Sequence, residues 1–401
     1  MKHLKFLTAG LFCSFLFLIG CKKEIQSDES VSSTTLLNEK TVATQSSPLS
    51  AELKEKLKQL RANLPADYEK RLQINSSLLL KRHPQYRNLV LRAMKAIEPT
   101  ECDDNTAVSQ WLNNELTDWD SDVVFFAVLT GMLDFPTYDA LLFVNSSDNQ
   151  YYGINGEFSH SNAKGFKDLK RFWNIETNGM VIGAMHGNML LDREKVIRTD
   201  MAVYGDSRSA AEYWADLILS LMQDIPQYRK GNHPIFTFNA FALSGFSFPP
   251  YGNIPNKIIM GDGIQHGFSA VGYQDVAPQA ILAHEFGHHI QFQLGLFGEE
   301  SSPEATRRTE LMADAYAAYY LSHARGASMQ WKRVKQFMQV FFNIGDCGFT
   351  NENHHGTPAQ RLAAAEWGYS IANDAQKQGH ILTSQEFASL FEKKLPELIN
   401  H

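Results

Sequence analysis

The sequence has few cysteines, no surplus of basic residues and no internal repeat. Its 37 Lys and Arg residues are outnumbered by 44 Asp and Glu residues, for a formal net charge of -7, which argues against a nucleic-acid partner. After the N-terminus no apolar run has the length of a membrane span. The longest, Val123 to Leu133, predicts a buried helix.

The N-terminus has the pattern of an export signal. Lys2 and Lys5 precede an apolar segment, residues 6–20, and Leu18-Ile19-Gly20-Cys21 follows. This arrangement resembles a bacterial lipoprotein signal with its lipobox, which implies cleavage before Cys21 and a lipid anchor on that cysteine. The protein is then membrane-anchored in the cell envelope, at the periplasmic face or the cell surface. The alternative is an ordinary signal peptide with an incidental Cys21, and the mature protein is exported in both cases.

Export also bears on the remaining cysteines. Of the four, Cys13 and Cys21 belong to the leader, which leaves Cys102 and Cys347. In an oxidising compartment these two form either a disulfide or two separate thiols, and the sequence does not decide between them.

Composition and periodicity divide the chain into four regions: a signal peptide (1–21), a flexible Ser- and Thr-rich tether (22–50), a helical region (51–145) and a metal-binding domain (146–401). Leucines at helical spacing predict helices from Ala51 to about Ile97, the second of them containing the run Leu89 to Met94. Further helices are expected at 164–172 and 209–223. The Asn155-Gly156 pair within 151–158 predicts a β-hairpin.

The main chemical motif is His284-Glu285-Phe286-Gly287-His288. On a helix, the H-E-x-x-H pattern places two imidazoles one turn apart to bind zinc and a carboxylate beside the water that the metal activates. Asp275 can cap this helix, Pro278 suits its first turn and Gly295 can end it. A metal-dependent hydrolase is therefore the leading hypothesis.

The motif leaves a catalytic zinc one protein ligand short. A third histidine in the pattern H-E-x-x-H-x-x-G-x-x-H is excluded, because Gln291 and Leu294 stand at the required positions. A second helix, starting at Ser302-Pro303-Glu304 and running towards Gly326, offers Glu310 and Asp314 four residues apart on one face. Glu310 can complete the zinc ligands, and Asp314 can accept the spare N–H of His284.

With these residues in view, the chain resembles thermolysin-like zinc peptidases, which share the E-x-x-x-D spacing. It is more similar to the neutral zinc metallopeptidase family of bacteria, which is gluzincin-like. That family combines H-E-x-G-H-H-x-Q, E-L-x-A-D and H-G-T-x-x-Q-R, and here these motifs are residues 284–291, 310–314 and 355–361. The resemblance covers about residues 284 to 369, and it implies one zinc ion per chain and a peptide or protein substrate.

The third motif also predicts local structure. Thr357, Pro358 and Gln360 form the start of a helix, with His355 in the loop before it. His355 has two interpretations: a hydrogen-bond donor to the oxyanion of peptide hydrolysis, or a histidine that braces the loop. His354 and His289 are weaker candidates, since His289 lies five positions from His284 and points off its face.

The expected mechanism uses zinc held by His284, His288 and Glu310, with Glu285 as the general base. Tyr273 or Tyr316 are alternatives to His355 as oxyanion donor. The expected fold is α+β and zincin-like, helix-rich with a small sheet over the active-site helix. Residues 256–263 are predicted to form its substrate-binding edge strand.

Two other functions stay open at this point. One is a zinc amidase acting on cell-wall peptides, which the envelope address suggests. The other is a non-catalytic zinc-binding lipoprotein, although a pure metal scaffold has no need of Glu285.

Overall fold

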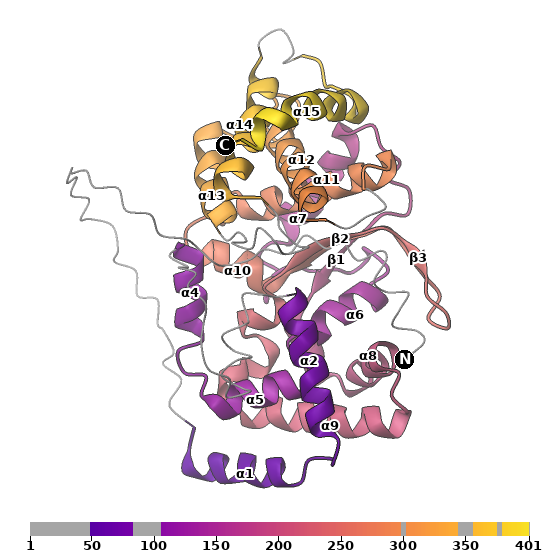
Figure 1. Cartoon of the computed structure of the whole chain (residues 1–401), viewed down its shortest axis with the longest axis vertical. Coiled ribbons are helices and arrows are strands. Elements are labelled where there is room, and N and C mark those ends of the chain that lie inside the picture. The colour runs from indigo at the N-terminus through magenta and orange to yellow at the C-terminus, as the bar shows by residue number, and fades with distance from the viewer. Residues whose placement is uncertain (1–48, 83–105, 298–301, 344–355, 375–378, 401) are drawn as a thin grey trace, which may run out of the picture.

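The computed structural model describes residues 49–82, 106–297, 302–343, 356–374 and 379–400. These residues form a helix-rich α+β structure in which a small sheet lies between two groups of helices (Figure 1). One group contains α7 (Ser159–Phe172), α11 (Ala277–Leu294), α12 (Pro303–Ser322), α13 (Trp331–Asn343), α14 (Pro358–Asn373) and α15 (Ser384–Leu398). The other contains α2 (Tyr68–Arg82), α5 (Ser121–Thr130), α6 (Phe135–Phe143), α8 (Arg193–Tyr204) and α9 (Arg208–Asp224).

The predicted N-terminal helices are present where the structure describes the chain. They are α1 (Ala51–Ala62) and α2, and Ser50 caps α1 by accepting a hydrogen bond from the N–H of Leu53 at 3.1 Å. α1 is tied to α9 by an ion pair between Lys56 and Asp224. The run from Leu89 to Met94 lies outside the described residues, as does almost all of the predicted tether.

The apolar segment after Asp120 is part of the core. Asp120 caps α5 through its side chain, and Gly131 ends the helix in the left-handed conformation at φ 76°. The stretch Ser121–Phe143 is long and apolar enough to cross a membrane, but its apolar 18-residue window is entirely buried inside the protein. The expectation of a buried helix at this position is confirmed.

The main sheet has three strands in the order β1 (Val181–Met185), β5 (Lys257–Gly261), β2 (Ala240–Leu243). β1 is parallel to β5, and β2 is antiparallel to it. The strand predicted at 256–263 is therefore present as β5, but it is not an edge strand, because both of its sides are paired. A second, two-stranded ribbon is formed by β3 (Phe246–Ser247) and β4 (Asn253–Ile254).

The predicted hairpin at 151–158 is wrong. Asn155 and Gly156 do lie in a turn, but no strand flanks it. The backbone N–H of Gly153 donates to Asp262, and the N–H of Asn155 donates to Glu157. These side chains occupy the groups that a second strand would have paired. The helices predicted at 164–172 and 209–223 are confirmed as α7 and α9.

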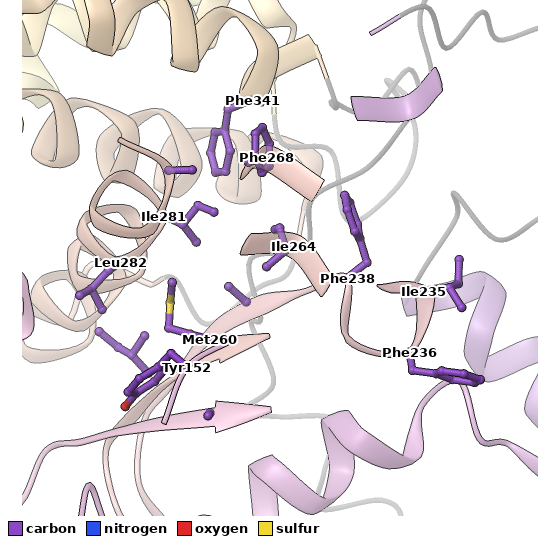
Figure 2. Close-up of a cluster of buried hydrophobic side chains, with 14 of the residues drawn as sticks. Tyr152, Ile235, Phe236, Phe238, Met260, Ile264, Phe268, Ile281, Leu282 and Phe341 are labelled. Atoms are coloured by element: carbon purple, nitrogen blue, oxygen red, sulfur yellow. The ribbon is translucent and has the colours of Figure 1, made fainter. Parts of the chain in front are cut away.

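A large hydrophobic cluster joins the sheet to the group of helices that contains α11 and α12. Figure 2 shows Met260 of β5 pointing toward Ile281 and Leu282 of α11, and all three are fully buried. Helix α10 (Asp262–Ala270) follows β5 directly and contacts both β5 and α11. Helix α4 (Ala107–Glu115) packs against α10. Three short 3-10 helices connect these elements: Gly187–Leu191, Pro226–Gly231 and Pro234–Thr237.

Two glycines allow helices α11, α12 and α14 to pack closely. A Cβ atom on Gly287 of α11 would lie 3.1 Å from the Cα of Ala313, and one on Gly368 of α14 would lie 2.3 Å from the carbonyl oxygen of Ala315. Both neighbours belong to α12, so α12 is held against α11 on one side and α14 on the other. The described parts of the three sequence motifs are thereby brought together.

Candidate metal centre

Helix α11 carries the motif from His284 to His288, and the local sequence explains where this helix begins and ends. Pro278 lies in the first turn, and Gly295 ends the helix with φ 63°. The predicted cap at Asp275 is wrong, because the helix begins after Val276 without a side-chain cap. Asp275 instead forms an ion pair with Arg333 of α13 at 2.6 Å.

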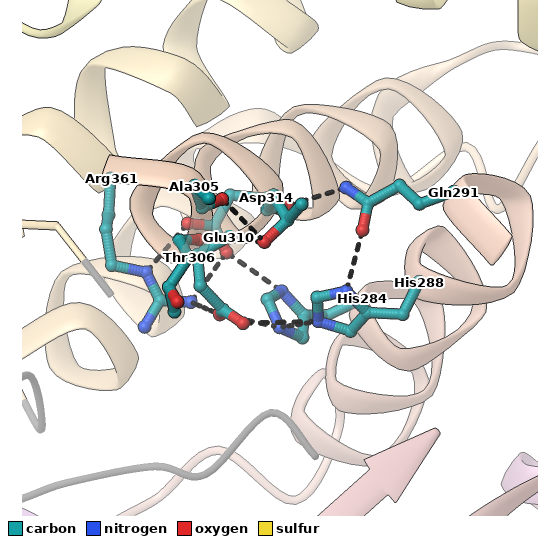
Figure 3. Close-up of polar contacts among 9 residues, drawn as sticks. His284, His288, Gln291, Ala305, Thr306, Glu310, Asp314 and Arg361 are labelled. Atoms are coloured by element: carbon teal, nitrogen blue, oxygen red, sulfur yellow. Dashed lines mark hydrogen bonds and ion pairs between the residues drawn. The ribbon is translucent and has the colours of Figure 1, made fainter. Parts of the chain in front are cut away.

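Helix α12 brings the second motif to the first. Ser302 caps it by accepting a hydrogen bond from the N–H of Ala305 at 3.1 Å, as the sequence predicts. The ligand atoms of His284, His288 and Glu310 all lie within 4.8 Å of one another, and each residue is at most 4% exposed (Figure 3). The three residues proposed from the sequence as zinc ligands therefore converge in space.

The hydrogen bonds of the two histidines fix which ring nitrogens face the cluster. His284 Nδ1 lies 2.9 Å from Asp314 Oδ1, and His288 Nδ1 lies 2.9 Å from Gln291 Oε1. Since both partners are acceptors, each Nδ1 carries a proton and each Nε2 is turned towards the cluster. The two Nε2 atoms are 3.2 Å apart. At this distance the two nitrogens share either a proton, donated by His284 to His288, or a metal ion that both bind.

The donor spacing fits a zinc ion. Tetrahedral zinc with bonds of 2.0–2.1 Å places two of its nitrogen ligands roughly 3.3 Å apart. The observed separation of the Nε2 atoms is 3.2 Å, and each Nε2 is 3.4 Å from an oxygen of Glu310. The nitrogen and carboxylate donors are also those that zinc prefers, so the residues present fit this metal.

The pKa values of the two histidines also favour a positive charge within the cluster. Burial lowers the pKa of His284, but Asp314 and Glu310 outweigh it and raise that pKa to about 10. For His288 burial prevails over the nearby charge of Glu310, and its pKa falls to about 4. Without a metal, the three side chains thus favour one positive charge between them, in the place where a cation would lie.

Glu285 has the arrangement of a general base. It is 2% exposed, and its Oε2 has no hydrogen-bond partner among the described residues. The backbone of Ala242 in β2 lies near enough to its carboxylate to lower the pKa of Glu285. Burial, only partly offset by the charge of His284, raises its pKa to about 8. A buried carboxylate oxygen without a partner is costly, and a water molecule at the centre would satisfy it.

Two buried residues extend the site beyond the sequence-based assignment. Gln291 accepts from His288 and also donates from Nε2 to the carbonyl of Thr309 at 2.6 Å, so it joins α11 to α12. Arg361 of α14 donates two hydrogen bonds to Asp314, at 2.7 and 2.8 Å, and lies 3.6 Å from Glu310 (Figure 3). Each is the last residue of a motif quoted above, but its partner could not be read from spacing alone.

The third motif forms the predicted helix start. Thr357 and Gln360 make a capping box at the beginning of α14, at 3.1 Å in both directions. The preceding Gly356 has φ 93° and lies against Leu311 of α12. His354 and His355 lie outside the described residues, so the role of His355 stays a prediction. The same holds for Cys21, Cys102 and Cys347.

The other candidates are placed elsewhere. Tyr316 donates its hydroxyl to the carbonyl of Ser384 at 2.8 Å within an aromatic cluster, so its suggested role as oxyanion donor is wrong. Tyr273 lies beneath the guanidinium of Arg333, 4.8 Å from ring centre to Cζ. His289 points away from the centre as expected, with Nε2 2.8 Å from the carbonyl oxygen of Lys257.

Comparison with known proteins gives little further identification. No protein-family model and no solved structure matches the chain. Uncharacterized proteins of Mycobacterium bovis and of two strains of Mycobacterium tuberculosis are 30% identical to it over 122 residues, which cover 24% of this chain. The match spans 42% of the length of each of these relatives. Their function is not described, so the site itself has to carry the interpretation.

Proposed function

We propose that this chain is a zinc-dependent peptidase with a zincin-like fold, similar to the neutral zinc metallopeptidase family. The observation that carries the proposal is the buried Glu285, whose Oε2 has no hydrogen-bond partner among the described residues. Its carboxylate interacts electrostatically with His284 and Glu310, two of the three converging donors. A site that only stores or displays a metal does not need this carboxylate.

The chemistry follows from these positions. A zinc ion held by the three donors would supply Lewis acidity, acidifying a water molecule and polarising an amide carbonyl. Glu285 takes the proton of the attacking water and later gives it to the leaving amine, a role worth about 10² to 10⁴ in rate.

The surrounding residues hold the donors in place. Asp314 and Gln291 fix the ring orientation of His284 and His288, and Arg361 holds Asp314. Each of these groups is buried and hydrogen-bonded, so the donors are positioned before a metal or a substrate arrives.

We assign the place of a bound peptide to β2 instead of β5. The two edge strands of the sheet differ: on β1 the outward N–H groups of Ile182 and Ala184 are occupied by the side chains of Ser147 and Gln150. β2 packs next to α11, and the backbone of its Ala242 lies close to the carboxylate of Glu285. An extended peptide alongside β2 would therefore pass beside the base.

The location follows from the leader. The proposed lipid on Cys21 would hold the enzyme in the cell envelope, where protein substrates and cell-wall peptides both occur. The lipoprotein-like signal at the N-terminus is the one observation favouring a zinc amidase of cell-wall peptides as a second candidate function.

Substrate digestion tests the proposal. The full exported chain, purified in detergent, is incubated with a broad peptide library and separately with peptidoglycan, each with and without a zinc chelator. Chelator-sensitive cleavage of library peptides is the expected result. Release of fragments from peptidoglycan alone would establish the amidase instead, and one zinc per chain with no turnover on either would establish a binding protein.

A further inference from the structure

A second cluster of chemically active residues lies at the carboxyl ends of β1 and β5. In the parallel pair Met185 is opposite Gly261, so the next residue of each strand, His186 and Asp262, must meet at the same end. His186 Nδ1 lies 2.6 Å from Asp262 Oδ2. The other carboxylate oxygen of Asp262 accepts from the N–H of Gly153 at 2.9 Å, and Asp262 is only 6% exposed.

The ring of His186 is held in a single orientation. Tyr151 stacks on it with the ring centres 4.0 Å apart and the planes at 18°. Since Asp262 accepts from Nδ1, the ring presents Nε2 away from the carboxylate. No side chain or backbone group of the described residues bonds to Nε2. A histidine fixed on one nitrogen and one face, with its second nitrogen unbonded, is poised to contact something else.

That nitrogen belongs to a ring that lines a cavity of about 210 Å³. One part of the cavity wall is apolar, formed by Pro136, Ala140, Met185 and Met189. The remainder is polar and includes His186, Asn188 and Lys195. The exposed side chains of Asn149 and Tyr151 stand at its rim, so the cavity is accessible from solvent.

The charges of this cavity are unequal. Its carboxylate, Asp139, is already paired with Arg198 at 2.7 Å. Its ammonium group, on Lys195 in the first turn of α8, has no ion pair within the described part of the chain. The cavity therefore presents one uncompensated positive charge next to an apolar wall. A dianion such as phosphate would be repelled by Asp139 and has no apolar part to place on the apolar wall. A monoanion with an apolar body can pair with Lys195 and also pack against that wall.

The cavity is separate from the metal centre. Glu285 lies near Ala242 of β2, at one edge of the sheet, while His186 follows β1 at the other edge, with β5 between them. A bridge between β1 and β5 alone would account for Asp262 and the Nδ1 of His186. It leaves unexplained the Tyr151 stack and the unpaired Lys195 on the same cavity wall.

We propose that this cavity binds a small organic carboxylate. Its carboxylate group pairs with Lys195, a polar atom of the ligand hydrogen-bonds to Nε2 of His186, and its apolar body packs against Met185 and Met189. The inference depends on these contacts and stands whether or not the metal centre is a peptidase.

Calorimetric titration with matched probes tests this assignment. N-acetyl-leucine is compared with its neutral amide and with inorganic phosphate, using the full chain with 1,10-phenanthroline. This chelator carries no carboxylate, and it prevents a zinc ion from binding the probe at the metal centre. We expect saturable binding of the carboxylate at millimolar concentrations and weaker binding of the amide. Lys195→Met should weaken carboxylate binding about tenfold, as for one charge-assisted hydrogen bond.

The control is Lys167→Met, which removes an exposed lysine from α7 and should leave binding unchanged. His186→Gln should weaken binding of both the carboxylate and the amide, because the hydrogen bond to Nε2 does not depend on the charge of the ligand. Equal affinity for the carboxylate and the amide, tighter binding of phosphate, or no saturation by any probe would overturn the proposal. So would unchanged affinity in a Lys195→Met protein with the wild-type circular dichroism spectrum.

Discussion

At the scale of single residues, the centre depends on buried charges that satisfy one another. Asp314 is 1% exposed and bonds both to His284 Nδ1 and to the guanidinium of Arg361. Arg361 is itself 2% exposed. Neither charge has access to water, so each depends on the other for compensation.

Arg361→Met should therefore be strongly destabilising. Removing one partner of a buried ion pair typically costs about 3–5 kcal/mol, because the remaining charge is left uncompensated. The double variant Arg361→Met with Asp314→Asn should recover part of this loss, which urea unfolding of the single and double variants would measure. If Arg361→Met unfolds at the wild-type urea concentration, the pair is not essential to the fold.

At this scale the sequence predicts which side chains lie together where a motif has a fixed spacing. The spacing of His284 and His288, and of Glu310 and Asp314, dictates which side chains share a helix face. Gln291 and Arg361 could not be assigned roles, because their partners depend on how α11, α12 and α14 pack together. Tyr316 was misplaced for the same reason: its helix is as predicted, but its hydroxyl faces Ser384.

At the scale of secondary-structure elements, close helix packing assembles the centre. Gly368 lets α14 approach α12 until its Cα hydrogens face the carbonyl of Ala315, one residue beyond Asp314. Arg361 lies on the same helix, two turns before Gly368. The distance between α12 and α14 therefore controls the contact between Arg361 and Asp314.

Gly368→Ala should destabilise the protein by about 1–3 kcal/mol, since its methyl group would overpack against backbone that cannot easily move. A Cβ at this position would start 2.3 Å from a carbonyl oxygen. Gly379→Ala is the matched control, because nothing lies within 4 Å of a Cβ there. Equal unfolding midpoints for the two variants would mean that the helices can separate at no cost.

Elements were predictable to different degrees. Helices with caps and glycine stops, such as α12 and α14, agree with the sequence because those signals act within a few residues. The order of the sheet could not be predicted, since β5 pairs with residues 181–185 and 240–243, far along the chain. The Asn155-Gly156 turn suggested a hairpin, but the side chains of Asp262 and Glu157 bind the backbone there.

At the scale of the whole molecule, burial makes stability depend on pH. His233 is 1% exposed, accepts at Nδ1 from the N–H of Ile235 and lies with Nε2 2.9 Å from the carbonyl of Glu115. Burial lowers its pKa from 6.5 to about 3. Between these values the unfolded chain binds more protons than the folded one, so stability is lost as the pH falls through this window.

His233→Gln should reduce this dependence. The contribution of His233 is on the order of 1.4 kcal/mol of unfolding free energy per pH unit inside the window, because one proton is taken up on unfolding. The variant should therefore lose less stability than the wild type between pH 6.5 and about pH 3. His160→Gln, at an exposed position of α7, is the control in urea unfolding across this range. Parallel curves for wild type and His233→Gln would contradict the assignment.

The central claim for the molecule is that the converging donors hold zinc for hydrolysis with Glu285 as the base. The most direct measurement compares zinc content and peptide turnover in wild type, Glu285→Gln and the surface control Glu304→Gln on α12. We expect one zinc per chain in all three proteins, with turnover lowered by at least about 10² in Glu285→Gln alone. Full turnover by Glu285→Gln with its zinc in place would contradict the account.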